Sequence, residues 1–339
     1  MHQPLEGKVV LITGGTGSFG RHCAKKLLMT YHCEKVIIFS RDEWKQWQMM
    51  ESDAVFSHPH IRYFLGDVRD VDRLKRALSG VDIVIHAAAL KQVPAAEYNP
   101  SEFIKTNVMG AMNVIDAAID AGVKKVIALS TDKAVNPVNL YGATKLCSDK
   151  LFVAGNSYVG KRGYPRFAVV RYGNVANSRG SIVPRWKRLI AMGANKLAIT
   201  DIRMTRFWIT LNEAVDFVIE CIGTMKGGEI FVAKTPSVKI IDLAEALAPG
   251  ISYDLCGIRP GEKLHEVLIS VEDARHTQEY KNHYIILPEL ASYMPAPMHA
   301  PAGGSPLPEG CSYTSDSNRE WLTGEQLRHV TSATEVFES

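Results

Sequence analysis

Residues 8–20 read Lys8-Val9-Val10-Leu11-Ile12-Thr13-Gly14-Gly15-Thr16-Gly17-Ser18-Phe19-Gly20. The first half of this stretch is apolar and β-branched, which is typical of a buried strand, and a helical pattern follows over residues 21–28. A strand, a glycine turn and a helix N-terminus together present backbone N–H groups and a helix dipole to a pyrophosphate. The stretch therefore predicts a dinucleotide-binding α/β fold that begins near the N-terminus.

The glycines of this turn follow the spacing G-x-x-G-x-x-G. This spacing resembles the short-chain dehydrogenase/reductase variant of the nucleotide-binding fold. A glycine pattern alone is a weak signal, but the flanking strand and helix give it the context that a cofactor site needs. The cofactor-binding residues that we expect here are Gly14, Thr16, Gly17, Ser18, Phe19 and Gly20.

The second predicted strand, residues 35–39, ends in Ser40-Arg41-Asp42. An NAD enzyme usually places an acidic residue at this point to hold the ribose 2′-hydroxyl, whereas an arginine suits a 2′-phosphate. Ser40 and Arg41 therefore predict NADP as the cofactor. The alternative is that Arg41 is only a solvated residue at the start of the next helix.

Two later turns add to the expected cofactor site. Asp67 and Val68 follow the third strand and resemble the turn that contacts adenine. The small residues Ala87, Ala88 and Ala89 follow the fourth strand and would leave room along the cofactor. Lys91 lies two residues beyond Ala89 and could touch the cofactor or a sugar.

Strand and helix patterns alternate from residue 8 to about residue 167, which predicts a Rossmann-like, doubly wound parallel sheet of the α/β class. We expect an NADP-binding domain over residues 1–170, with contributions from later segments. Residues 171–339 should form a smaller, mixed α/β, mainly substrate-binding region. Residues 294–306 are rich in Pro, Ala and Gly and should be an exposed loop.

The segment Ser130-Thr131-Asp132-Lys133 follows another strand, and Tyr141 and Lys145 lie one helical turn apart soon after it. An ammonium group beside the phenol would lower the pKa of Tyr141 and make it a usable base, and the Thr131 hydroxyl could share the substrate's proton. Simple alcohol oxidation needs neither Asp132 nor Lys133. Expelling water from a neighbouring carbon needs both an acid and a base, so the pattern predicts elimination chemistry.

Composition narrows the class of protein. The chain has 339 residues, of which 46% are hydrophobic and 22% charged, and a net charge of +3. That charge is too small and too scattered to indicate nucleic acid or a membrane as a partner. Six cysteines without C-x-x-C spacing favour neither disulfides nor a metal site. Without an apolar run of membrane-spanning length or a recognisable leader, we expect a cytoplasmic protein.

Seven stretches together resemble the inverting UDP-N-acetylglucosamine 4,6-dehydratases of pseudaminic acid biosynthesis, members of the extended short-chain dehydrogenase/reductase superfamily. The likeness runs from residue 8 to about residue 290. It is specific because Asp132-Lys133 stands where deoxysugar dehydratases acting on dTDP-glucose have Asp-Glu. The stretches are residues 13–20, 39–43, 88–94, 129–134, 139–145, 200–208 and 257–263.

The resemblance implies a hydro-lyase reaction without net redox change. Tyr141 would take the 4-hydroxyl proton as hydride passes from C4 to NADP. Lys133, with its pKa lowered by burial and the cationic cofactor, would remove the C5 hydrogen while Asp132 protonates the departing 6-hydroxyl. Hydride would return to C6, and reprotonation from the opposite face would give the L-configured 4-keto-6-deoxy sugar.

The resemblance also implies ligands and partners. The substrate would be UDP-N-acetylglucosamine, and the product would serve flagellin glycosylation. A homo-oligomer built from dimers, up to a hexamer, is expected, with Trp44, Trp47 and Met50 either in its interface or in the core. The implied substrate-binding residues are Lys91, Asn174, Thr200, Arg206, Arg259 and Glu262.

Several alternatives remain open at this point. An epimerase of the same superfamily would keep Tyr141 and Lys145 but has no need to expel water. A bifunctional dehydratase and C5-epimerase is possible because an enolate at C5 can be reprotonated on either face. A sensor that binds NADP without turnover would not need the Tyr141/Lys145 pair. Asp132 and Lys133 could also be a helix cap and a solvated side chain.

Overall fold

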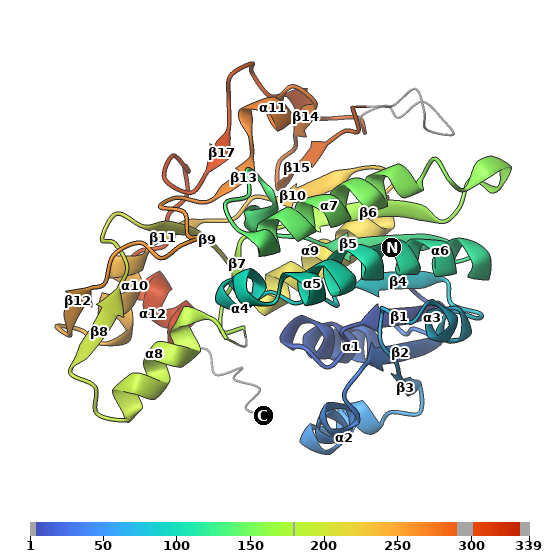
Figure 1. Ribbon diagram of the computed structural model, residues 1–339, viewed down its shortest axis with the longest axis horizontal. Coiled ribbons are helices and arrows are strands. Elements are labelled where there is room, and N and C mark those ends of the chain that lie inside the picture. The colour runs from blue at the N-terminus through green and yellow to red at the C-terminus, as the bar shows by residue number, and fades with distance from the viewer. Residues whose placement is uncertain (1–4, 179, 290–300, 333–339) are drawn as a thin grey trace.

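The computed structural model of the protein describes residues 5–178, 180–289 and 301–332. Its centre is a ten-stranded sheet (Figure 1). In spatial order the strands are β16 (Ser305–Pro306), β14 (Thr277–Glu279), β15 (His283–Ile286), β10 (Ile230–Ala233), β6 (Arg166–Arg171), β5 (Lys125–Leu129), β4 (Ile83–His86), β1 (Val9–Thr13), β2 (Lys35–Ser40) and β3 (Ile61–Leu65). The predicted doubly wound α/β fold is confirmed.

The strands from β10 to β3 are parallel, and β15, β14 and β16 extend the sheet in antiparallel pairs. The chain order reverses between β1 and β4, which pair with each other. In such sheets ligands bind beyond the carboxyl ends of the strands at this reversal. The topology therefore places the candidate site next to the glycine turn that follows β1.

Helices cover both faces of the sheet, which is why its central strands are apolar on both sides. One face shares a core with α1 (Ser18–Thr30) and α9 (Leu211–Thr224). The other shares a core with α3 (Val71–Ala77), α6 (Gly110–Ala121) and α7 (Leu140–Gly155). Val10 and Val84, on neighbouring strands, are both completely buried.

Polar side chains begin several of these helices. Asp70 accepts a hydrogen bond from the backbone N–H of Arg73 at the start of α3, and Thr210 and Glu213 form a reciprocal capping box at the start of α9. Helix α1 differs, because Gly17 precedes it and supplies no side-chain cap. Its first backbone N–H groups thus have no side-chain cap at the cavity described below.

A smaller region lies beside the sheet, at the left of Figure 1. Its own core includes Trp186, Leu243 and Leu327. It contains α8 (Ile182–Ala191), β8 (Lys196–Ile199), α10 (Ile240–Leu247), β12 (Ser252–Leu255) and α12 (Gly324–Ser332). A three-stranded sheet of β7 (Asn174–Val175), β9 (Thr205–Ile209) and β11 (Ser237–Lys239) lies between this region and the centre. Because strands beyond residue 170 also join the central sheet, residue 170 remains a proposed boundary.

The remaining elements are short helical turns and strands, together with the ten-residue helix α2. They are α2 (Glu43–Ser52), η1 (Ala54–Ser57), α4 (Val93–Tyr98), α5 (Pro100–Phe103), η2 (Ile104–Met109), η3 (Asp132–Ala134), η4 (Gly160–Arg162), β13 (Val267–Ile269), α11 (Val271–Ala274) and β17 (Tyr313–Thr314). Of the stretch expected to be an exposed loop, residues 294–300 lie outside the described residues, and Ser305–Pro306 form β16 at the sheet edge. Within the described part, no helix is long and apolar enough to cross a membrane.

On α2, Trp44 and Trp47 stack with ring centroids 4.6 Å apart and leave 58% and 47% of their surfaces exposed. They are therefore not core residues.

Candidate active site

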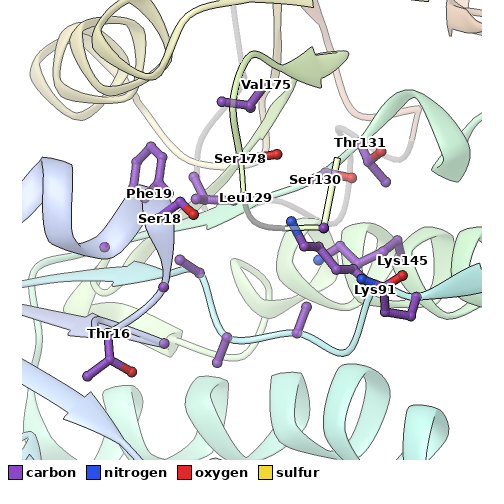
Figure 2. Close-up of a pocket in the computed structure, with 18 of the residues that line it drawn as sticks. Thr16, Ser18, Phe19, Lys91, Leu129, Ser130, Thr131, Lys145, Val175 and Ser178 are labelled. Carbon is purple, nitrogen blue, oxygen red and sulfur yellow. The ribbon is translucent and has the colours of Figure 1, made fainter. Parts of the chain in front are cut away.

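A cavity of about 780 Å³ opens at the carboxyl ends of the central strands. Figure 2 shows Thr16, Ser18 and Phe19 of the glycine turn on one side of it, and Lys91 and Lys145 on the other. The structure thus brings most of the predicted residues to one cleft. Those that line it are Gly14, Thr16, Gly17, Ser18, Phe19, Gly20, Ser40, Arg41, Val68, Ala87, Ala88, Ala89, Lys91, Thr131, Asp132, Lys133, Tyr141, Lys145 and Asn174.

The glycine turn fits a dinucleotide. Gly14 has φ +66°, and a Cβ atom there would lie 2.9 Å from the Cα atom of Ala88. Only glycine allows the turn after β1 to approach the turn after β4 this closely. The start of α1, which no side chain caps, lines the cavity and suits the pyrophosphate of a dinucleotide.

Arg41 lies at the end of β2 with half of its side chain exposed. Its Nη1 atom is 3.8 Å from Oδ2 of Asp67, and that same oxygen lies 2.7 Å from Nη2 of Arg69. Asp67 is not among the residues that line the cavity, whereas Lys45, which the sequence did not single out, is. Two cationic side chains therefore stand near the position expected for the 2′-substituent of the cofactor's ribose.

Gly142 explains how Tyr141 reaches the acid/base segment. Helix α7 packs so closely on η3 that a Cβ atom at Gly142 would clash with the carbonyl oxygen of Lys133. The Asn139 side chain accepts a hydrogen bond from the backbone N–H of Gly142 and begins the helix. Tyr141 and Lys145 are consequently both buried beside Asp132 and Lys133.

The electrostatics of Tyr141 differ from the sequence-based expectation. Burial raises the pKa of Tyr141 to about 12, while the positive charge of Lys133 and a hydrogen bond with Thr131 act in the opposite direction. Burial also lowers the pKa of Lys145, against the charge of Asp149. Burial therefore outweighs the nearby positive charge on the phenol, and the cation that acts on Tyr141 most is Lys133 rather than Lys145.

Asp132 and Lys133 form a partly buried ion pair, with Nζ of Lys133 3.0 Å from Oδ1 of the buried Asp132 and 25% of the lysine side chain exposed. The Thr131 hydroxyl donates to the same oxygen at 2.8 Å, and Oε1 of Glu266 lies 3.1 Å from the ammonium. Burial opposes the charge of Lys133, but the two carboxylates outweigh it and raise its pKa. The expected lowering of the Lys133 pKa is thus wrong for the protein's own charges, because that expectation did not include the attraction of Asp132 and Glu266 for the ammonium.

The ion pair also excludes the alternative that Asp132 and Lys133 are only a helix cap and a solvated side chain. Asp132 is fully buried, and burial followed by the negative charge of Glu266 raises its pKa. Asp132 is therefore not a solvent-exposed helix cap, and Lys133 is not a solvated surface lysine.

The implied substrate-binding residues fall into two groups. Asn174 lines the cavity, and its buried Oδ1 atom has no hydrogen-bond partner among the described residues. Thr200, Arg206, Arg259 and Glu262 are not among the lining residues. Arg206 reaches Glu266 with 3.6 Å between Nε and Oε1, whereas Arg259 and Glu262 form a partly exposed ion pair of 3.7 Å with each other.

Sequence reasoning missed several residues of the cavity wall. Gln92, Tyr172, Ser178, Ser181 and Leu211 line it. Gln92 follows Lys91 and could have been found by extending that motif, but the two serines lie in an irregular stretch without a pattern. Two histidines near the site are hydrogen-bonded to threonines: Nδ1 of His86 is 2.8 Å from Oγ1 of Thr13, and Nδ1 of His265 is 2.8 Å from Oγ1 of Thr205.

A doubly wound sheet whose glycine turn faces a buried Tyr/Lys pair defines a protein of the short-chain dehydrogenase/reductase type. The comparisons with known proteins give the family. The model described as "Polysaccharide biosynthesis protein" matches residues 10–288. The chain belongs to this family.

Individual relatives are more specific. UDP-N-acetylglucosamine 4,6-dehydratase (inverting) of Campylobacter jejuni subsp. jejuni (serotype O:23/36, strain 81-176) is 54% identical over 98% of this chain and 100% of its own length. UDP-glucose 4-epimerase of Rickettsia akari is 42% identical over 82% of each chain. The X-ray structure of Pen from Bacillus thuringiensis has a TM-score of 0.86 and 36% identity, covering 96% of this chain and 97% of that one. The resemblance stated from the sequence is thereby confirmed.

Proposed function

We propose that the protein is an inverting UDP-N-acetylglucosamine 4,6-dehydratase. The observation that carries the proposal is the partly buried Asp132–Lys133 ion pair beside Tyr141 and Lys145 in the cavity of a dinucleotide-type fold. A protein that is 54% identical over nearly the whole chain bears this name. Pseudaminic acid biosynthesis and flagellin glycosylation are the proposed context of the product.

The proposed mechanism assigns a proton transfer to each buried group. A bound nicotinamide would supply reversible acceptance of hydride, taken from C4 of the sugar and returned to C6. Tyr141 accepts the 4-hydroxyl proton, with Thr131 and Lys145 orienting the groups around it. The resulting 4-ketone acidifies the C5 hydrogen, which Lys133 removes, while Asp132 protonates the leaving 6-hydroxyl.

The ion pair supports these roles because one proton transfer within it produces both the general base and the general acid. When the proton moves from Nζ of Lys133 to Oδ1 of Asp132 across 3.0 Å, the pair becomes a neutral amine and a neutral carboxylic acid. Burial favours this neutral form and, together with the negative charge of Glu266, raises the pKa of Asp132, whereas the two carboxylates raise the pKa of Lys133 and oppose the transfer. An ammonium and a carboxylate would have the wrong protonation states for both tasks.

The substrate assignment is also a proposal. Lys91 and Asn174 face the cavity, and burial lowers the pKa of Lys91. Arg206 remains a proposed ligand of the sugar diphosphate, although its side chain contacts Glu266 and does not line the cavity. Thr200, Arg259 and Glu262 remain proposed nucleotide ligands.

We propose NADP as the cofactor, bound with its 2′-phosphate near Arg41. Arg41→Ala should weaken NADP binding by about 1.5 kcal/mol, the low end of the range for a charged hydrogen bond, because the side chain is half exposed. Binding of NAD should change little. Titration calorimetry with both cofactors checks this, with Arg76→Ala on α3 as a control away from the cavity. Equal affinity of the native protein for NAD and NADP would contradict the preference.

An epimerase is the second candidate, since a relative with 42% identity bears that name. An epimerase has no use for a partly buried acid/base pair beside the Tyr/Lys pair, so Asp132 and Lys133 favour the dehydratase.

A homo-oligomer remains proposed, with the exposed Trp44 and Trp47 as candidate interface residues. A cytoplasmic location is likewise proposed, supported by cysteines that are all free.

Turnover without a reductant tests the proposed function. Purified protein should convert UDP-N-acetylglucosamine to a 4-keto-6-deoxy sugar with no added reductant, because hydride taken from C4 returns to C6. NADPH absorbance should not rise in proportion to product. Stoichiometric accumulation of NADPH would instead show an ordinary dehydrogenase, and formation of a 4-epimer would favour the second candidate.

A further inference from the structure

Glu266 lies in the acid/base cluster although no sequence motif singled it out. It precedes β13 and keeps only 2% of its surface exposed. Its Oε1 atom is 3.1 Å from Nζ of Lys133 and 3.6 Å from Nε of Arg206. Glu266 is thus a second carboxylate on the proposed C5 base, besides the sequence neighbour Asp132.

The backbone around Glu266 is fixed from both directions. Its N–H donates to Oγ of Ser315 at 2.9 Å, and the N–H of Ser315 donates to the carbonyl oxygen of Glu266 at 2.9 Å. Oγ of Ser315 is in turn 2.6 Å from Oγ1 of Thr205, which precedes Arg206 on β9. These bonds hold the carboxylate and the guanidinium in a set position relative to η3.

The charges around the two carboxyl groups are unequal. Glu266 faces Lys133 from η3 and Arg206 from β9, with Lys263 of the preceding loop acting at longer range. Asp132 faces Lys133 and the neutral hydroxyl of Thr131. Burial opposes the charge of both carboxyl groups, but the cations lower the pKa of Glu266, whereas the pKa of Asp132 is raised. Glu266 is therefore the carboxylate that stays ionised.

One oxygen of Asp132 lies where a neutral carboxyl group is more stable than a carboxylate. Oδ2 of Asp132 is buried and has no hydrogen-bond partner among the described residues. A protonated carboxyl group tolerates this position better than a carboxylate does, because burial disfavours the charged form. Oε2 of Glu266 is also buried without a hydrogen-bond partner among the described residues. Lys133 and Arg206, which lie near Oε1, offset the cost of burying the negative charge.

We propose that Glu266 is a positioning residue whose fixed negative charge keeps one proton on the Asp132–Lys133 pair over the working pH range and orients the Lys133 amine toward Asp132. The proposal rests on the proposed dehydratase function, in which the reactive state of the pair holds a single proton. The acidic limb of the pH profile of kcat marks the addition of a second proton to the Asp132–Lys133 pair. The alkaline limb marks the loss of the last proton from this pair. A negative charge nearby raises both pKa values of the pair.

The test is the pH dependence of kcat for Glu266→Gln with saturating UDP-N-acetylglucosamine and NADP. Because the substitution removes a negative charge a few ångströms from the Asp132–Lys133 pair, both limbs of the pH profile should move to lower pH by about one unit or more. Glu266→Asp keeps the charge, so its limbs should stay close to the native ones even if the rate falls. Glu229→Gln, a buried glutamate outside the cavity, is the matched control and should leave both limbs in place.

Different outcomes separate this proposal from the proposed function. Native limbs in an active Glu266→Gln variant would overturn the role of Glu266 and leave the dehydratase intact. A displacement of about one unit in Glu266→Asp would overturn it as well, whether or not Glu266→Gln folds, as judged by thermal unfolding. Failure of the native protein to form any 6-deoxy product would instead count against the function itself.

Discussion

Tyr141→Phe should reduce oxidation of the sugar at C4 by about 10²–10⁴-fold, the range for loss of a general base. The substitution removes one hydroxyl from a buried ring and should leave the fold intact. Without that hydroxyl, no group is placed to accept the 4-hydroxyl proton as hydride leaves. The measurement is the single-turnover appearance of NADPH absorbance after mixing with UDP-N-acetylglucosamine.

The control for this variant is Tyr158→Phe, an exposed tyrosine with 59% of its surface accessible. It should behave as the native protein does. Because burial raises the pKa of Tyr141 to about 12, the phenol needs a positive charge close by before it can act as a base. Native rates of C4 oxidation in Tyr141→Phe would show that another group takes the proton.

Substitutions of the ion pair should separate the two halves of the elimination. Lys133→Met should leave oxidation at C4 possible, although slower because it removes the positive charge that acts most on Tyr141, and should block removal of the C5 hydrogen. NADPH absorbance should therefore appear without any 6-deoxy product. Asp132→Asn should stop loss of water by a similar factor of about 10²–10⁴, since it removes the general acid. It should nevertheless permit exchange of the C5 hydrogen with deuterium, provided that Lys133 acts as the base.

Exchange at C5, followed by NMR in deuterated water, distinguishes the two assignments. Exchange that persists in Lys133→Met and vanishes in Asp132→Asn would reverse the roles of base and acid. Product formation at the native rate in both variants would remove the dehydratase interpretation and leave an epimerase as the better account.

Much of the fold could be predicted from the sequence because its signals are local. The apolar runs of β1, β2 and β5 and the glycine turn each depend on residues adjacent in the chain. The site residues at the strand ends follow from the topology, since parallel strands bring their carboxyl ends to one edge. For this reason Gly14, Arg41 and Thr131 could be assigned to one cleft from the order of strands and turns along the chain.

What the sequence did not reveal depends on long-range packing. Glu266 reaches Lys133 only because η3 and the start of β13 are brought together, and it belongs to no recognisable motif. The directions of the pKa shifts of Tyr141 and Lys133 depend on burial and on this extra carboxylate, neither of which is visible in a linear pattern. The antiparallel extension by β14 to β16 was missed because these strands are short.

The most direct test of the dehydratase proposal is to incubate the native protein with UDP-N-acetylglucosamine and NADP in deuterated water and to examine the product by NMR. The account predicts a 4-keto-6-deoxy sugar that carries solvent deuterium at C5 and has the inverted, L configuration there. A 6-deoxy product with retained configuration at C5 would contradict the inversion. A product that keeps its 6-hydroxyl group would contradict the dehydratase function altogether.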